Sequence, residues 1–189
     1  MSLSIFWQIF YWAWFASEVI IAVVTRTRNR SGDVRDRGTI YLLWVVIATS
    51  ITVGIWLSEA QGSNLPGGAH WLRLVSLLML AFGLALRWMA VASLGKSFSS
   101  NVAIHATQRV KKDGLYHWMR HPSYTGLLLC LYAVSVHTRN WISMLVIGLP
   151  TTIALLYRIH IEEIALRNHF GAEYIEYSRE TKRLVPGIY

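Results

Sequence analysis

The sequence has few charged residues and only one cysteine, and these scarcities narrow the class of protein. Only 15% of the residues are charged, against about a quarter in a typical soluble domain, whereas 54% are apolar. The single cysteine, Cys130, lies in an apolar run, which excludes a disulfide within the chain and suits a small buried side chain. This composition predicts an integral membrane protein, with the lipid bilayer as a partner.

The net charge of +8 at pH 7 would suit either nucleic acid or an anionic membrane surface. The charges fall in short bursts between apolar runs, and the sequence has neither a basic face nor an RNA-binding signature. We therefore predict no nucleic-acid partner.

Nucleotide-binding and metal-binding motifs are also missing. The sequence has no G-x-G-x-x-G and no P-loop, so a nucleotide would have to bind between helices and connecting loops. His117 and His121 have a spacing that can ligate zinc on a helix, but Pro122 disfavours the α conformation at His121. No third ligand stands nearby, so we predict no metal.

Five apolar runs predict an all-α bundle of five transmembrane helices, because about 20 apolar residues cross the hydrocarbon core. The runs are 3–24, 40–57, 71–94, 121–136 and a last one that begins at Trp141. The last helix is expected to run to residue 169, about 43 Å against about 30 Å of hydrocarbon, so its end should extend into the cytoplasm. Gly171 should end that helix, and 172–181 should form a short C-terminal helix.

The whole chain, 1–189, is interpreted as a single membrane domain. Residues 1–93 hold three N-terminal spans, and residues 94–189 hold a polar connection, a helical hairpin and a C-terminal tail. Of the 18 basic residues, 15 fall in three segments that share one side of the membrane if the N-terminus lies outside. The positive-inside rule therefore predicts an outer N-terminus and a cytoplasmic C-terminus.

Two clusters of polar residues adjoin the last two apolar runs. The first spans 114–126 and the second spans 158–163. In the second cluster, Arg158 and Glu162 are four residues apart and share a helix face, whereas Glu163 points about 100° away. Taken alone, this spacing also fits a surface ion pair. A tight turn at 137–140, however, would pack the last two spans antiparallel and bring His121 and Tyr124 level with Glu162.

These residues resemble the isoprenylcysteine carboxyl methyltransferase family. The resemblance covers about half of the chain, from residue 94 onward. The matching motifs are Gly114-x-Tyr116-x-x-x-Arg120-His121-Pro122-x-Tyr124-x-Gly126, Glu162-Glu163, Phe170-Gly171-x-Glu173-Tyr174-x-x-Tyr177 and Arg183-Leu184-x-Pro186. A wider group that shares the C-terminal motif includes phospholipid N-methyltransferases and NADPH-dependent sterol reductases.

The resemblance implies a membrane methyltransferase that uses S-adenosylmethionine and releases S-adenosylhomocysteine. It implies that the cofactor is bound by Asn101, Gln108, Arg109, Val110, Lys111, Tyr116, His121, Pro122, Ser123, Tyr124 and Glu162. It also implies that Arg158 binds the substrate and that Arg158 and Glu162 are the catalytic residues. Residues 108–111 depart from the commoner His-x-Leu-Val of the family, although backbone contacts could survive that change.

The expected reaction is O-methylation of the carboxylate of an isoprenylated cysteine or of a similar small lipophilic acid, at a site that faces the cytoplasm. A carboxylate nucleophile needs no general base at neutral pH, but it needs alignment and loss of water. Phospholipid N-methylation is an alternative, in which Glu162 or Glu163 would receive a proton. An NADPH-dependent membrane reductase and a membrane scaffold with a degenerate site are further alternatives.

Two smaller expectations concern the spans themselves. Glu18 and Arg87 are predicted at similar depth, where they either form an ion pair or extend separately toward water. Ala81 and Ala85 are predicted to allow close packing of helices.

Overall fold

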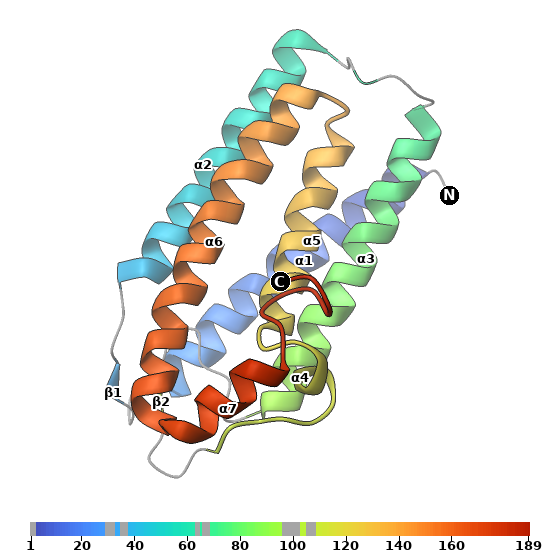
Figure 1. Cartoon of the computed structure of the whole chain (residues 1–189). Helices are drawn as coiled ribbons and strands as arrows, with labels where there is room; N and C mark the ends of the chain where they lie inside the picture. The colour runs from blue at the N-terminus through green and yellow to red at the C-terminus, as the bar shows by residue number, and fades with distance from the viewer. Residues whose placement is uncertain are drawn as a thin grey trace.

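A computed structural model of the protein describes residues 3–28, 33–34, 38–62, 65, 69–95, 103–104 and 109–189. These residues form a bundle of long helices with shorter helices at one end (Figure 1). The elements in chain order are α1 (Leu3–Arg28), β1 (Asp33–Val34), α2 (Gly38–Gln61), α3 (Ala69–Leu94), β2 (Ala103–Ile104), α4 (Leu115–Trp118), α5 (Pro122–His137), α6 (Trp141–Phe170) and α7 (Ala172–Glu180). The predicted all-helical fold is confirmed.

The helix α5 occupies the middle of the bundle. It packs against α3 on one side and α6 on the other, α2 packs against α6, and α1 packs against α3 (Figure 1). Fully buried residues of α5 such as Leu131 and Ala133 form part of the core together with Leu80 of α3 and Ile147 of α6. The polar cluster before α5 is thereby carried to the centre of one end of the molecule.

A tight turn joins α5 to α6, as the sequence predicts. Arg139 adopts a positive φ of 53°, and the side chain of Asn140 begins α6 by accepting hydrogen bonds from the backbone N–H groups of Ile142 at 2.9 Å and Ser143 at 3.1 Å. Asn at this position satisfies N–H groups that have no partner within the helix. The two helices therefore run antiparallel.

Two glycines allow α3 and α5 to approach closely. A Cβ atom on Gly126 would lie 2.7 Å from the backbone oxygen of Gly83, and a Cβ atom on Gly83 would lie 2.8 Å from the backbone oxygen of Gly126. Small residues are what permit such backbone contact between membrane helices. The expectation for Ala85 is wrong, because Ala85 is exposed, whereas Ala81 is half-buried and the expectation for it stays a prediction.

Four of the helices are long and apolar enough to cross a membrane: α1, α2, α3 and α6. Large apolar side chains on their outer surfaces are exposed, including Trp56, Phe82 and Leu149, as expected of helices that face lipid. Helix α5 has 16 residues, or about 24 Å at 1.5 Å per residue. The chain is an integral membrane protein with an all-helical fold.

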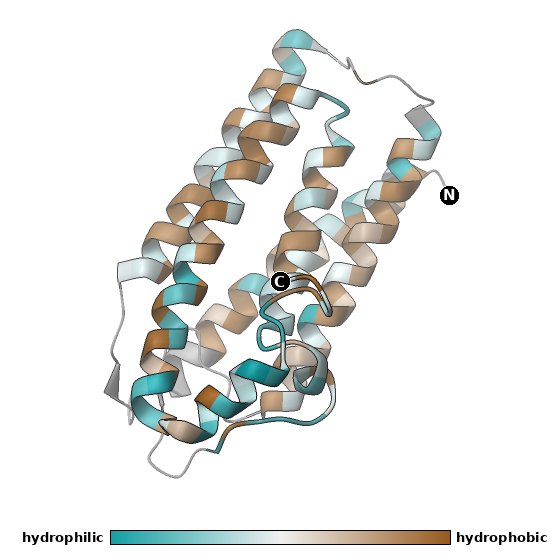
Figure 2. Cartoon of the chain, viewed as in Figure 1, coloured by the Kyte–Doolittle hydropathy of each residue, from teal (hydrophilic) through white to brown (hydrophobic). Residues whose placement is uncertain are grey.

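The last long helix, α6, extends beyond the apolar part of the bundle. Its 30 residues span about 45 Å. Hydrophilic residues gather on its final turns and on α7, whereas the rest of the bundle is mostly hydrophobic (Figure 2). Gly171, with a φ of 56°, ends α6, and α7 follows as the sequence predicts.

A two-residue antiparallel ladder departs from the helical pattern, and the sequence did not predict it. Asp33 pairs with Ile104 and Val34 with Ala103, so the connections after α1 and α3 meet. The connection after α2 meets the turn before α6, because the amide of Asn140 donates to the carbonyl of Gly62 at 3.0 Å.

Candidate active site

The two polar clusters of the sequence meet where α5 begins and α6 nears its end. The phenol of Tyr124 on α5 donates a hydrogen bond to Oε2 of Glu162 on α6 at 2.8 Å. Tyr124 and Glu162 are both half-buried. The prediction that Tyr124 lies level with Glu162 is confirmed.

Arg158 lies one turn before Glu162 on the same face of α6. Its side chain is only 1% exposed and donates to the hydroxyl of Thr39 at the start of α2. Its guanidinium also interacts electrostatically with the phenol of Tyr124. A buried cation, a phenol and a half-buried carboxylate therefore share one region between α2, α5 and α6. A guanidinium can bind an anionic group of a ligand, and a carboxylate can bind a cationic group.

The imidazole of His121 is buried beside Tyr124. The two rings stack with centroids 5.7 Å apart and an interplanar angle of 27°. Nε2 of His121 lies 3.5 Å from Oε1 of Glu163. Among the described residues, this nitrogen has no partner with the geometry of a hydrogen bond. His121 therefore lies beside Glu163 and beside the ring of Tyr124, whose phenol binds Glu162.

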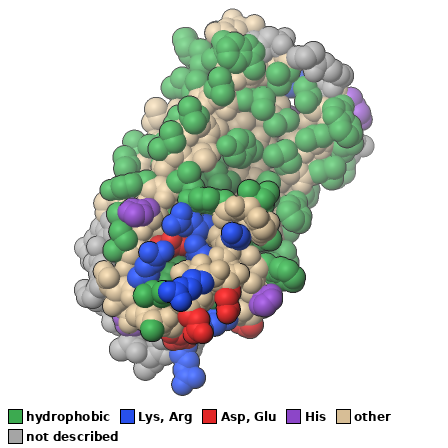
Figure 3. Space-filling model, viewed as in Figure 1, with side chains coloured by type: hydrophobic (Ala, Val, Ile, Leu, Met, Phe, Trp, Pro, Cys, Tyr) green, Lys and Arg blue, Asp and Glu red, His purple; other side chains and the backbone are tan. Residues whose placement is uncertain are grey.

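Glu163 lies in a different environment from Glu162. It is 2% exposed, and its carboxylate is 2.8 Å from Nε of Arg120 and 3.0 Å from Nε of Arg183. Arg167 approaches the same carboxylate at 3.7 Å. Figure 3 shows Lys and Arg side chains gathered with acidic ones at this end of the molecule, and hydrophobic side chains over the rest of the face. The carboxylate of Glu163 thus forms ion pairs with arginines from the segment before α5, from α6 itself and from the C-terminal tail.

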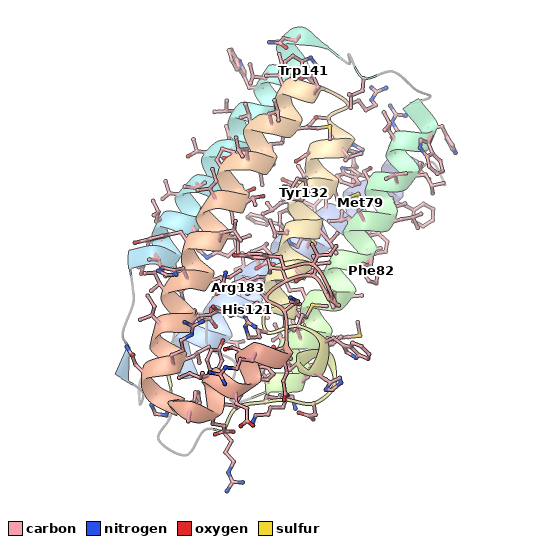
Figure 4. All side chains as sticks on the ribbon, in the orientation of Figure 1. Met79, Phe82, His121, Tyr132, Trp141 and Arg183 are labelled. Atoms are coloured by element: carbon pink, nitrogen blue, oxygen red, sulfur yellow. The ribbon has the colours of Figure 1, made fainter. Side chains whose placement is uncertain are left out.

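These arginines tie the C-terminal tail to the start of α5. The backbone N–H of Arg120 donates to the carbonyl of Lys182 at 2.8 Å, and that of His121 donates to the carbonyl of Arg183 at 2.9 Å. The hydroxyl of Thr125 donates to the carbonyl of Leu184 at 2.8 Å. His121 and Arg183 accordingly lie close together near α7, far from Trp141 at the opposite end (Figure 4). This network was not predicted, although Arg120 and Arg183 both stand in motifs that the sequence shares with the family.

Tyr116, one of the predicted cofactor residues, is buried and makes contacts through both its backbone and its ring. Its carbonyl accepts a hydrogen bond from the phenol of Tyr177 at 2.5 Å, which holds α7 against α4. Its own phenol lies 3.4 Å from the carbonyl of Ala90 on α3. Burial raises the pKa of Tyr177 to about 12 and also raises the pKa values of Tyr116 and Tyr174, so these phenols stay neutral.

Pro122 and Ser123 begin α5 and are both buried. Pro122 occupies the first helical turn, where its missing N–H has no cost. The hydroxyl of Ser123 accepts a hydrogen bond from Arg87 of α3 at 2.9 Å. Arg87 in turn forms an ion pair with Glu18 of α1, so the pairing that the sequence left open is confirmed.

The predicted cofactor residues of the polar connection are only partly within the described structure. Asn101 and Gln108 lie outside the described residues. Arg109 is exposed and Val110 is half-buried. Lys111 pairs with Asp113 at 3.0 Å, and its hydrogen bond lowers the pKa of Asp113. Lys111 is therefore paired with a residue only two positions further along the same connection.

Among the residues that the structure describes, no group of three or more His, Cys, Asp or Glu side chains is placed to hold a metal ion. His117 is exposed and makes an edge contact with the ring of Trp118. It lies outside the buried cluster that contains His121.

The fold and this buried polar cluster define the class of the protein, a helical integral membrane protein with a charged site at one end of a helical hairpin. Residues 75–168, which include Tyr124, Arg158 and Glu162, match the sequence model of the isoprenylcysteine carboxyl methyltransferase (ICMT) family. Over these residues the chain is similar to that family, and the resemblance noted from its motifs is confirmed.

Curated relatives agree with the family match. A probable protein-S-isoprenylcysteine O-methyltransferase of Oryza sativa subsp. indica is 34% identical over 116 residues, which are 60% of this chain and 61% of that protein. The protein-S-isoprenylcysteine O-methyltransferase of Homo sapiens is 34% identical over 125 residues, which are 62% of this chain and 42% of that protein. The chain thus spans less than two thirds of the length of these relatives.

A solved structure is similar in fold. It is described as the eukaryotic intramembrane Ras methyltransferase ICMT, and it matches with a TM-score of 0.61 at 24% sequence identity. The match covers 77% of this chain and 52% of that chain. The likeness is one of fold, and it extends the resemblance beyond the C-terminal motifs.

Proposed function

We propose that this protein is an S-adenosylmethionine-dependent methyltransferase that methylates a lipophilic acceptor, with the carboxylate of an isoprenylated cysteine or a similar small lipophilic acid as the preferred group. The observation that carries the proposal is the hydrogen bond from Tyr124 to Glu162 beside the buried Arg158. All three residues lie in the region that matches the family.

The residues present fit the methyl donor. S-adenosylmethionine, when bound, supplies a methyl group on a positively charged sulfur. The half-buried carboxylate of Glu162 suits its ammonium group or ribose hydroxyls, and the stacked rings of His121 and Tyr124 suit its carboxylate or its adenine. Tyr116 and the residues Arg109–Lys111 would complete the binding site, together with Asn101 and Gln108 of the same connection.

Arg158 is the residue proposed to orient the acceptor. A guanidinium binds a carboxylate through two parallel hydrogen bonds, and the low exposure of Arg158 strengthens that attraction. The surrounding helices exclude water, which removes the hydration shell of the reacting carboxylate. No general base is needed for a carboxylate, because it is already ionised at neutral pH.

We further propose five spans, with the N-terminus outside and this site at the cytoplasmic surface. The connections after α1 and α3 meet in the ladder between β1 and β2, whereas Gly62 and Asn140 join the other two connections. This alternation is what a bundle with five crossings requires, and the basic segments then face the cytoplasm. Single cysteines placed at Ser4 and Ser178 in a Cys130→Ala background should be labelled from opposite sides of sealed membranes. Labelling of both from one side would contradict the topology.

The function is tested with purified protein in lipid nanodiscs and S-adenosylmethionine carrying a tritiated methyl group. Farnesylcysteine should be labelled in the wild type, and labelling should be lost in Glu162→Gln. Exclusive labelling of phosphatidylethanolamine would overturn the choice of acceptor in favour of phospholipid N-methylation. Binding of NADPH but not of S-adenosylhomocysteine, measured by calorimetry, would overturn the methyltransferase proposal itself.

A further inference from the structure

A buried ion pair connects the first helix to the start of α5. Arg87 of α3 binds Glu18 of α1 through two nitrogens, and its Nη2 donates to Oε2 of Glu18 at 2.5 Å. Glu18 is 4% exposed and Arg87 is 5% exposed. Because an unpaired charge is costly at such depth, each residue depends on the other.

The same guanidinium also binds α5. Its Nη1 donates to the hydroxyl of Ser123 at 2.9 Å and to the backbone carbonyl of Ser123 at 3.2 Å. Ser123 directly precedes Tyr124, whose phenol binds Glu162. One arginine side chain therefore links α1, α3 and the first turn of α5, next to the residue that contacts Glu162.

The backbone geometry at this place leaves little freedom. A Cβ atom on Gly126 would lie 2.7 Å from the backbone nitrogen of Arg87 and 2.7 Å from the backbone oxygen of Gly83. The backbone of Arg87 is thus in direct contact with α5, one turn after Ser123. From this fixed position, the guanidinium binds both oxygens of Ser123 while Glu18 holds its other side.

We infer that Glu18 and Arg87 are positioning residues for the proposed active site: through Ser123, they hold the first turn of α5 in the orientation that directs Tyr124 at Glu162. Glu18 belongs to α1, outside the residues 75–168 that match the family. The consequence for ligand binding rests on the proposed function, but the order of the first turn of α5 does not.

The test compares amide hydrogen exchange over residues 120–126 in ligand-free protein, in nanodiscs, for three variants. Glu18→Gln combined with Arg87→Gln removes both charges, so that no charge is left buried without a partner. Arg87→Lys keeps the pair with Glu18 but replaces the planar fork by a single ammonium group. Cys130→Ala is the matched control, because Cys130 is fully buried in the same contact between α3 and α5 but lies one turn beyond Gly126.

Exchange over 120–126 should be at least fivefold faster in the double variant and in Arg87→Lys than in the wild type, and unchanged in Cys130→Ala. If the pair serves only to neutralise buried charge, Arg87→Lys will exchange like the wild type, and the inference is overturned. Should the double variant fail to fold, the comparison of Arg87→Lys with Cys130→Ala decides.

Binding of S-adenosylhomocysteine, measured by calorimetry, then separates this inference from the proposed function. We expect the Kd of Arg87→Lys to be about tenfold higher than that of the wild type, with Cys130→Ala within twofold of the wild type. A wild type that binds no S-adenosylhomocysteine would count against the proposed function, and the exchange rates alone would then support or overturn the inference.

Discussion

Two neighbouring glutamates of α6 face different parts of the molecule and have different partners. Glu162 shares a face with Arg158, is half-buried and takes a hydrogen bond from the phenol of Tyr124. Glu163, about 100° further around the helix, is buried and bound by Arg120 and Arg183. One carboxylate of the pair is therefore partly exposed, while the other binds the arginines that hold the tail of the chain in place.

Glu163→Gln should have the largest effect, and it should be an effect on stability. The change leaves Arg120, whose side chain is 7% exposed, without its anionic partner. Breaking a buried ion pair from one side costs about 3 to 5 kcal/mol. Thermal unfolding of the protein in detergent should show the loss, and proteases should cleave the tail after α7 more readily. An unchanged melting temperature would show that Glu163 does not have the structural role that separates it from Glu162.

Glu162→Gln should lower methyl transfer at least 100-fold, equivalent to about 2.7 kcal/mol. It should leave the melting temperature near that of the wild type, because Glu162 is half-buried and contacts a neutral phenol. The measurement is the initial rate with tritiated S-adenosylmethionine, alongside thermal unfolding of the same preparation. Parallel losses of rate and stability would indicate that Glu162 also has a structural role.

Tyr124→Phe should weaken binding of S-adenosylhomocysteine about tenfold, or about 1.4 kcal/mol. The substitution removes the hydroxyl that orients Glu162 and keeps the ring that stacks on His121. Calorimetry measures the Kd, and Tyr132→Phe is a matched control, because the phenol of Tyr132 contacts Thr152 further along the hairpin. Equal weakening in both variants would argue against a specific role for Tyr124.

Tyr177→Phe should have the smallest effect, and it should be an effect on stability. Tyr177 lies on α7, next to the C-terminal tail. It removes the hydrogen bond to the carbonyl of Tyr116, worth about 1 kcal/mol of stability. The melting temperature should fall slightly, with the Kd for S-adenosylhomocysteine within twofold of the wild type. A larger change in Kd than in stability would place Tyr177 with the ligand-binding residues.

Much of the fold was predictable because its signals are local. The apolar runs predicted the long helices, and the turn at 137–140 predicted the antiparallel α5 and α6. The helices extend beyond the predicted runs where polar residues continue them, as at the end of α2. The glycine pair at the close contact between α3 and α5 was not predicted, because hydropathy does not reveal which face of a helix meets its partner.

The candidate site was predictable in its location and less so in its detail. The spacing of Arg158 and Glu162 correctly placed them on one face, opposite Tyr124. The role of Ser123 was harder to anticipate, because its hydroxyl is bound by Arg87, an arginine 36 residues earlier in the chain. Such a contact depends on the crossing of two helices and on the rotation of each.

By itself, the sequence determined that the chain is a helical membrane protein with polar clusters beside its last two apolar runs. Periodicity and hydropathy carry that information, since they act over a few neighbouring residues. Only the tertiary structure decided that Glu163 binds Arg120 and Arg183 and that Glu18 supports α5 through Arg87. A buried charge takes whichever opposite charge the packing of distant segments brings within reach, and no local pattern specifies that partner.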